Sequence, residues 1–124
     1  MKTFEYVSNL FAARDVVHMA HLSTKKYSRH KALGNLYETI LDYLDNFVET
    51  YQGQHELMDF TIIHAEPVAD NAIVEYLLAF IGDVLLPAKK EFATNMDQYG
   101  HYVNDIEAFI GEIYHSIYKL RFLE

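Results

Sequence analysis

Residues 18–53 read HMAHLSTKKYSRHKALGNLYETILDYLDNFVETYQG, and this stretch decides the predicted fold. Its apolar side chains recur at steps of three and four residues, the spacing that places them on one face of an α-helix. The pattern predicts a helix from about Lys26 to Tyr51, with Gly53 just beyond its end as a C-terminal stop. The same spacing upstream predicts a helix from about Thr3 to Leu22. Because few residues separate the two helices, they form an antiparallel hairpin.

The second half of the chain predicts two further helices, from about Val68 to Phe92 and from about Met96 to Phe122. Pro87 lies inside the first of these, and we expect a kink or a break there because proline lacks a backbone donor and clashes with the preceding turn. Residues 53–67 show no long helical period and form a long connection. The connections between the four helices are short, long and short in turn, which predicts an all-α, ferritin-like four-helix bundle with one long crossover between helices 2 and 3. We expect residues 1–124 to form this bundle as a single domain.

The composition is that of a globular protein without thiol chemistry. Hydrophobic residues make up 51% of the chain and charged residues 23%, and cysteine is absent, which excludes disulfides and iron–sulfur clusters. The net charge of −8 disfavours a nucleic-acid partner. The longest apolar stretch, Tyr76–Ile81, is far shorter than the roughly 20 residues of a membrane helix, and the N-terminus has no signal-peptide pattern. We therefore expect a cytoplasmic protein with no membrane partner.

Histidines and carboxylates of metal-ligand type lie in the first predicted hairpin. His18 and His21 are one helical turn apart, and the hairpin brings His21 close to His30. Asp45 and Glu49 are also one turn apart, but they lie about 22 and 28 Å beyond His30 along the helix axis. One chain therefore cannot place His30 and Glu49 on one ion. Either the two groups have separate roles, or a second, antiparallel copy completes a shared site for iron, manganese or zinc.

This hairpin resembles the first two helices of the Dps-type mini-ferritins, over about 35 of the 124 residues. That family has a histidine at the end of the first helix, a second histidine, an aromatic seven residues later and an Asp-x-x-x-Glu pair. The matching residues here are, in order, His21, His30, Tyr37, Asp45 and Glu49. His18 is the alternative first ligand, and Gly34 stands where the family often has another acidic residue. The chain also resembles small ferritin-like proteins of tailed bacteriophages.

The resemblance implies a function and an assembly. The family's ferroxidase site joins the histidines of one subunit to the carboxylates of its two-fold partner, where ferrous iron is oxidised by peroxide or oxygen. The chain would then serve iron sequestration and oxidative protection as a homo-oligomer, a dimer at least and a cage at most, in the host cytoplasm if a phage encodes it. The rival hypothesis is a non-enzymatic structural or interaction protein, for instance a phage component, on the same bundle. A metal-dependent hydrolase is a third class.

One other motif competes for the metal. Glu112-Ile113-Tyr114-His115 is a Glu-x-x-His sequence, which di-iron bundles project inward from two helices. Only one copy occurs here, so Asp45 and Glu49 would have to replace the second, with Glu75 or Asp83 from the third helix.

Overall fold

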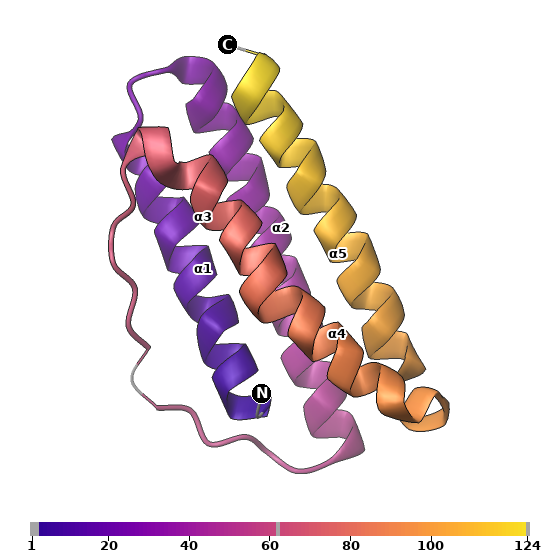
Figure 1. Ribbon diagram of the computed structural model, residues 1–124. Coiled ribbons are helices and arrows are strands. Elements are labelled where there is room, and N and C mark those ends of the chain that lie inside the picture. Colours follow the sequence, from indigo (N-terminus) through magenta and orange to yellow (C-terminus); the bar gives the residue numbers. More distant parts are fainter. Residues whose placement is uncertain (1–2, 62, 124) are drawn as a thin grey trace.

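The computed structural model describes residues 3–61 and 63–123, and over these residues the chain is helical with no strand. Helices α1 (Thr3–Ser23) and α2 (Tyr27–Gln54) pack along each other as an antiparallel hairpin, drawn from indigo to magenta in Figure 1. The predicted helices are confirmed here, and each bound lies within three residues of the expected position.

The second half is a nearly continuous series of helical segments. In order they are η1 (Asp70–Ala72), α3 (Ile73–Phe80), the π-helical η2 (Ile81–Leu85), α4 (Leu86–Phe92), η3 (Ala93–Asn95) and α5 (Met96–Phe122). The chain does not break at Pro87, which lies in the first turn of α4. Instead the backbone widens into a π turn just before it, where the Leu86 N–H donates to the Ile81 carbonyl. The wider turn relieves the clash that a proline ring makes with the carbonyl four residues earlier.

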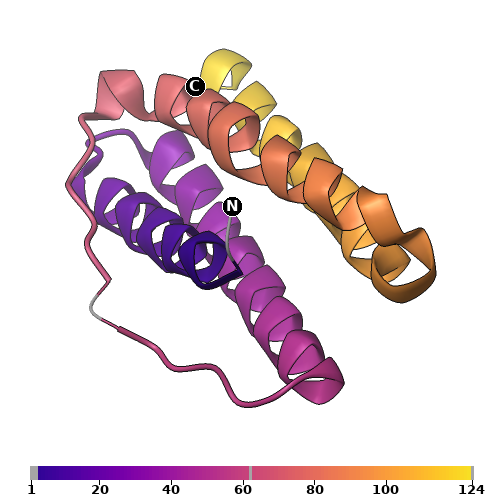
Figure 2. The same ribbon diagram turned by 60° about the horizontal axis from the view of Figure 1, so that its bottom comes forward.

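The long connection between the hairpins runs over residues 55–69, and its described part contains no helix or strand. It passes beside α1 from the end of α2 to the start of α3 (Figures 1 and 2). Phe60 of this connection meets Phe11 of α1 edge to face, with ring centroids 6.0 Å apart. Because the connection returns to the end of the molecule where α2 begins, α2 and the α3–α4 series run in the same direction. The prediction of an all-α chain is confirmed for the described residues.

The core between the helices is apolar and aromatic. Tyr6 of α1 and Tyr43 of α2 meet there with hydroxyl oxygens 2.6 Å apart, and Tyr43 stacks on Phe109 of α5 at 4.2 Å between ring centroids. Burial raises the pKa of both tyrosines, so both remain neutral phenols. Among the described residues, Arg29 is the one charged residue in the buried class. Within residues 3–61 and 63–123, no carboxylate therefore belongs to the buried class.

Because the two buried hydroxyls bond each other, we expect the effects of removing them on the free energy of unfolding to be non-additive. Tyr6→Phe is expected to lower the free energy of unfolding by about 1–2 kcal/mol, because it leaves the Tyr43 hydroxyl without its partner in the core. Tyr43→Phe should cost a similar amount for the same reason. The double variant removes both hydroxyls, so its cost in urea denaturation should be smaller than the sum of the two by about 1 kcal/mol. Strictly additive effects would contradict the hydrogen bond.

One stretch within Asp70–Phe122 is long and apolar enough to cross a membrane by length and composition, and 33% of that stretch is buried. This range contains the turn η3 between α4 and α5, where the chain reverses direction. Helices that form the core of soluble proteins meet the same test.

Candidate functional site

The turn between α1 and α2 brings His21 and His30 into direct contact. Nδ1 of His21 lies 2.6 Å from the carbonyl oxygen of His30, and Nδ1 of His30 lies 2.8 Å from the carbonyl oxygen of His21. The rings are stacked, with centroids 3.9 Å apart and planes inclined by 19°. A carbonyl oxygen only accepts hydrogen bonds, so each Nδ1 must carry a proton and donate it. In the neutral imidazole with this tautomer, Nε2 is the unprotonated nitrogen.

Gly34 makes room for this arrangement. A Cβ atom at position 34 would lie 2.8 Å from Cε1 of His21, closer than Cβ atoms approach in proteins, and 3.0 Å from Nδ1, which is tighter than most such contacts. The described glycines have no positive φ, so the close approach of the imidazole, and not an unusual backbone conformation, favours glycine here. In the sequence, Gly34 is visible as a glycine inside an otherwise regular helical pattern, which costs about 1 kcal/mol relative to alanine.

The third predicted histidine continues the stack. The His18 ring lies 6.3 Å from the His21 ring and 4.2 Å from the Tyr37 ring, at interplanar angles of 21° and 25°. These rings line an open hollow of about 450 Å³. Its lining comprises His18, His21, Tyr27, His30, Lys31, Gly34, Asn35, Tyr37 and Glu38. The hairpin thus assembles all three candidate histidines and Tyr37 at one end of the molecule.

The candidate carboxylates lie elsewhere. Asp45 and Glu49 are exposed on α2, and α2 is continuous from Tyr27 to Gln54, so the separation of about 22 and 28 Å from His30 holds. No group of three or more histidine, aspartate or glutamate side chains that could hold a metal occurs in residues 3–61 and 63–123. One chain therefore supplies the histidines at one place and the carboxylates at another.

The competing Glu112-x-x-His115 arrangement does not form. Glu112 and His115 are exposed on α5, and Glu75 and Asp83 are exposed on the α3–α4 series. A di-iron site inside a bundle needs these side chains to project inward. The expectation that they could share an internal metal is wrong, because the helical period of each segment points its apolar side chains to the core instead.

Sequence reasoning missed Arg29, which anchors the start of α2 beside the histidines. Its Nε donates to Asp70 Oδ1 at 3.0 Å, Nη2 to the Asp70 carbonyl at 2.8 Å and Nη1 to the Leu120 carbonyl at 2.9 Å. One side chain thus joins α2, η1 and the last turn of α5. No local signal could reveal it, because its partners are 41 and 91 residues away along the chain.

These features define an all-helical protein of two antiparallel hairpins with a paired-histidine turn in the first. Residues 21–120 match a family of unknown function, DUF5856, and the chain belongs to this family. An uncharacterised 14.6 kDa protein in the mobD-ri intergenic region of Enterobacteria phage T4 is 42% identical over 52 residues, or 42% of this chain and 41% of that protein.

The match to the phage protein therefore spans about two-fifths of its length. It agrees with the predicted likeness to phage proteins, whereas neither match is to a Dps or ferritin family. No solved structure matches the chain significantly.

Proposed function

We propose that the chain is a ferritin-like metal-binding protein whose metal sites are shared between two copies. Nε2 of His21 and His30 would bind ferrous iron, with manganese or zinc as alternative metals, and Asp45 and Glu49 of a second copy would complete the site. The observation that carries the proposal is the pair of Nδ1–H···O=C bonds. Metal-ligating histidines commonly donate their other ring N–H to a backbone carbonyl, which fixes the tautomer and the ring orientation.

The arrangement of the helices supports a ferritin-like assignment. The support is that α2 and the α3–α4 series run in the same direction and are joined by one long connection, since ferritin-like bundles also use one long crossover. The similarity to a phage protein supports a role in the cytoplasm of an infected host.

The need for a second copy follows from the geometry of α2. His30 lies near the start of this helix, and Asp45 and Glu49 lie in its second half with exposed side chains. If two α2 helices cross antiparallel near Thr39, each pair of histidines faces the carboxylates of the other copy. A two-fold dimer would then hold two equivalent sites, in which carboxylates neutralise the cation and imidazoles complete the ligand set.

The reaction implied by the resemblance is the oxidation of ferrous iron. Two ferrous ions each lose one electron to one molecule of hydrogen peroxide, which takes up two protons and leaves as two molecules of water. Two ferric ions remain as the product. The residues of the chain bind and orient the iron, and peroxide or dioxygen supplies the oxidant.

The test is a titration with ferrous iron without oxygen, followed by calorimetry. Wild type should bind metal at micromolar concentration. His30→Ala and Glu49→Ala should each weaken binding by about 100-fold or more, since even the loss of an outer partner of a ligand costs about 10–100-fold. His64→Ala is the matched control, because His64 is exposed on the connection and does not line the hollow beside the paired histidines.

Mixing the two binding-deficient variants tests whether the metal site is shared between two copies. A heterodimer of His30→Ala and Glu49→Ala has one site with both residues intact, so the mixture should recover up to half of the sites in the mixed dimers. Wild type that binds no metal would overturn the proposal. Tight binding by a strict monomer, or no recovery on mixing, would refute the shared site.

The rival function is that of a structural or interaction protein without a metal. One observation favours it: the two reciprocal histidine–carbonyl bonds already close the α1–α2 turn without an ion. Under this alternative, His21→Ala and His30→Ala lower thermal stability in metal-free buffer, and added metal has no effect on the stability of wild type. Under the metal-binding proposal, metal raises the stability of wild type by mass action.

A further inference from the structure

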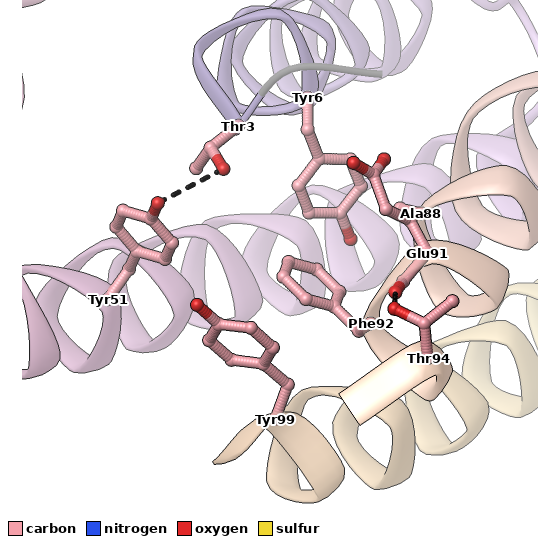
Figure 3. Close-up of a pocket in the computed structure, with 8 residues that line it drawn as sticks. All are labelled: Thr3, Tyr6, Tyr51, Ala88, Glu91, Phe92, Thr94 and Tyr99. Atoms are coloured by element: carbon pink, nitrogen blue, oxygen red, sulfur yellow. Dashed lines mark hydrogen bonds between the residues drawn. The ribbon is translucent and has the colours of Figure 1, made fainter. Parts of the chain in front are cut away.

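Aromatic rings of α5 occur in two different settings. Near the start of the helix, Tyr99 lies with Tyr51 and Phe92 around a cavity of about 220 Å³, and Figure 3 shows these rings around the same space. All three rings are packed against the hydrophobic core. Three rings in the second half of α5 are exposed instead, so packing within one chain does not account for them.

The exposed rings form a stripe along α5. Tyr114 and Tyr118 are each 50% exposed, and Phe122 is 68% exposed. The three residues are four apart, so they lie one turn above another on the same face of the helix. The ring centroids of Tyr118 and Phe122 are 5.9 Å apart. The outward face of a helix in a soluble protein is ordinarily polar, whereas exposed aromatic side chains that lie together are typical of a protein–protein interface.

Gly111 continues this stripe, three residues before Tyr114 and seven before Tyr118. Beyond its own turn of the helix, no described residue lies within 4 Å of a Cβ atom built at Gly111, and its φ is not positive. Glycine makes the interior of a helix less stable than alanine does, because it loses more conformational freedom on folding. A glycine at this position therefore suits a side chain that arrives from another molecule and packs on the bare backbone.

Charged residues of opposite sign lie at the two ends of the stripe. Glu107 precedes Gly111 by one turn, Arg121 lies in the last turn of α5, and both are exposed. Lys89 Nζ is 3.5 Å from Glu107 Oε1, but the Glu107 side chain is 55% exposed, so its carboxylate remains accessible to a further partner. A surface with an acidic and a basic end can be complementary to a reversed copy of itself.

We propose that a second copy of the chain packs antiparallel on this stripe, with the two-fold axis midway between Gly111 and Tyr118. Because both helices rise equally per residue, Tyr118 of one copy then lies level with Gly111 of the other. Glu107 of one copy lies within one residue of the level of Arg121 of the other. The two-fold axis repeats both contacts. A parallel pairing would instead set Glu107 against Glu107 and Tyr118 against Tyr118, so the charges and the glycine favour the antiparallel one.

This pairing does not rest on the proposed function, because it uses α5, whereas the shared metal site pairs α2. The stripe and its flanking charges extend from Glu107 to Phe122, about 23 Å along the helix. One helix on another over this length buries less than the roughly 1,600 Å² of a standard interface. The expected dimer is therefore weak, with a dissociation constant of about 10–100 µM.

Sedimentation equilibrium of wild type over about 1–500 µM should show a reversible equilibrium between monomer and dimer. Tyr118→Glu should weaken association at least about tenfold, because it puts a charge in place of a central tyrosine. Gly111→Leu should weaken it by a similar factor, because leucine fills the space that Tyr118 of the second copy needs, while the helix gains a better helix former.

Gly53→Leu is the matched control and should associate like wild type. Gly53 is an exposed glycine of α2, and a Cβ atom built there likewise has no described neighbour within 4 Å. Circular dichroism confirms that each variant is folded. A wild-type chain that stays monomeric at about 500 µM would overturn the proposal and leave the stripe to a different partner. A dimer that neither Tyr118→Glu nor Gly111→Leu weakens would also overturn it.

Chemical cross-linking distinguishes this pairing from the α2 pairing. The chain has no cysteine, so each variant introduces a single thiol. With a short bis-maleimide, Tyr114→Cys should give a cross-linked dimer, because this position lies next to the axis. His101→Cys should not, since the two copies of this position would be about 40 Å apart along α5. Thr39→Cys reports on the α2 pairing, and a cross-link there without one at position 114 would refute the α5 pairing while the proposed function stands.

Discussion

Replacing Arg29 by methionine is expected to lower the free energy of unfolding by about 3 kcal/mol. Arg29 is 8% exposed and, with partners among the described residues, makes three hydrogen bonds, two of them to backbone carbonyls. Methionine fills similar space but leaves the carbonyls of Asp70 and Leu120 without this donor. The charge attraction itself adds little to the figure, because the Asp70 side chain is 42% exposed and water screens the pair.

Two further variants make the Arg29 measurement specific. Arg29→Lys keeps the charge but not the planar fork, so it should recover less than half of the lost stability. Arg14→Met is the matched control, because Arg14 bonds only the adjacent Asp15 among the hydrogen bonds of the described residues, and it should change stability by less than about 1 kcal/mol. Urea denaturation measures all three. A loss for Arg29→Met no larger than that for Arg14→Met would show that the three bonds do not hold the helices together.

The second large effect concerns Gly34. Gly34→Ala places a methyl group 2.8 Å from Cε1 of His21, and the ring must move because it is the free end of a side chain. We expect the hydrogen bond from His21 Nδ1 to the His30 carbonyl to be lost. Stability should change by less than about 1 kcal/mol, since alanine in a helix regains about 0.5–1 kcal/mol relative to glycine. If the proposed metal site is real, affinity for ferrous iron should fall about 10–100-fold.

Nitrogen NMR of the histidine rings checks the displacement without any metal. Wild-type His21 should show the Nδ1–H tautomer, and the Gly34→Ala variant should show a mixture of tautomers. Gly111→Ala is the control, because nothing lies within 4 Å of a Cβ at that exposed helical position, and His21 should be unaffected. A variant that keeps the wild-type tautomer would disprove the close packing of His21 on α2. A changed tautomer with unchanged metal affinity would instead count against the metal site.

Much of the fold could be predicted because helical periodicity is a local signal. The apolar spacing predicts all four long helical stretches, and the bounds of the first two agree within three residues. The π turn before Pro87 was not predicted, because the sequence indicates only that a regular helix is strained there. A wider turn resolves that strain while Leu85 and Ala88 both stay buried.

The candidate site was predictable in part for the same reason. Hairpin geometry places His21 near His30, but their reciprocal bonds depend on the exact approach of the two helices at Gly34. Contacts between segments that lie far apart along the chain produce no pattern in the sequence. Arg29 lies in a basic stretch that is typical of a solvated surface, and the cavity lined by Tyr51 and Tyr99 forms only where α1, α2, α4 and α5 meet.

The connection over residues 55–69 is only slightly longer than the distance that it must span. Its 15 residues reach about 50 Å when fully extended, and α2, whose length it must travel back, is about 42 Å long. The path also has to pass around α1 (Figure 2). The length of this connection therefore determines where α3 can start. A chain that lost four residues here could no longer fold its own second hairpin onto its first, and the two halves could pair only by exchange between molecules.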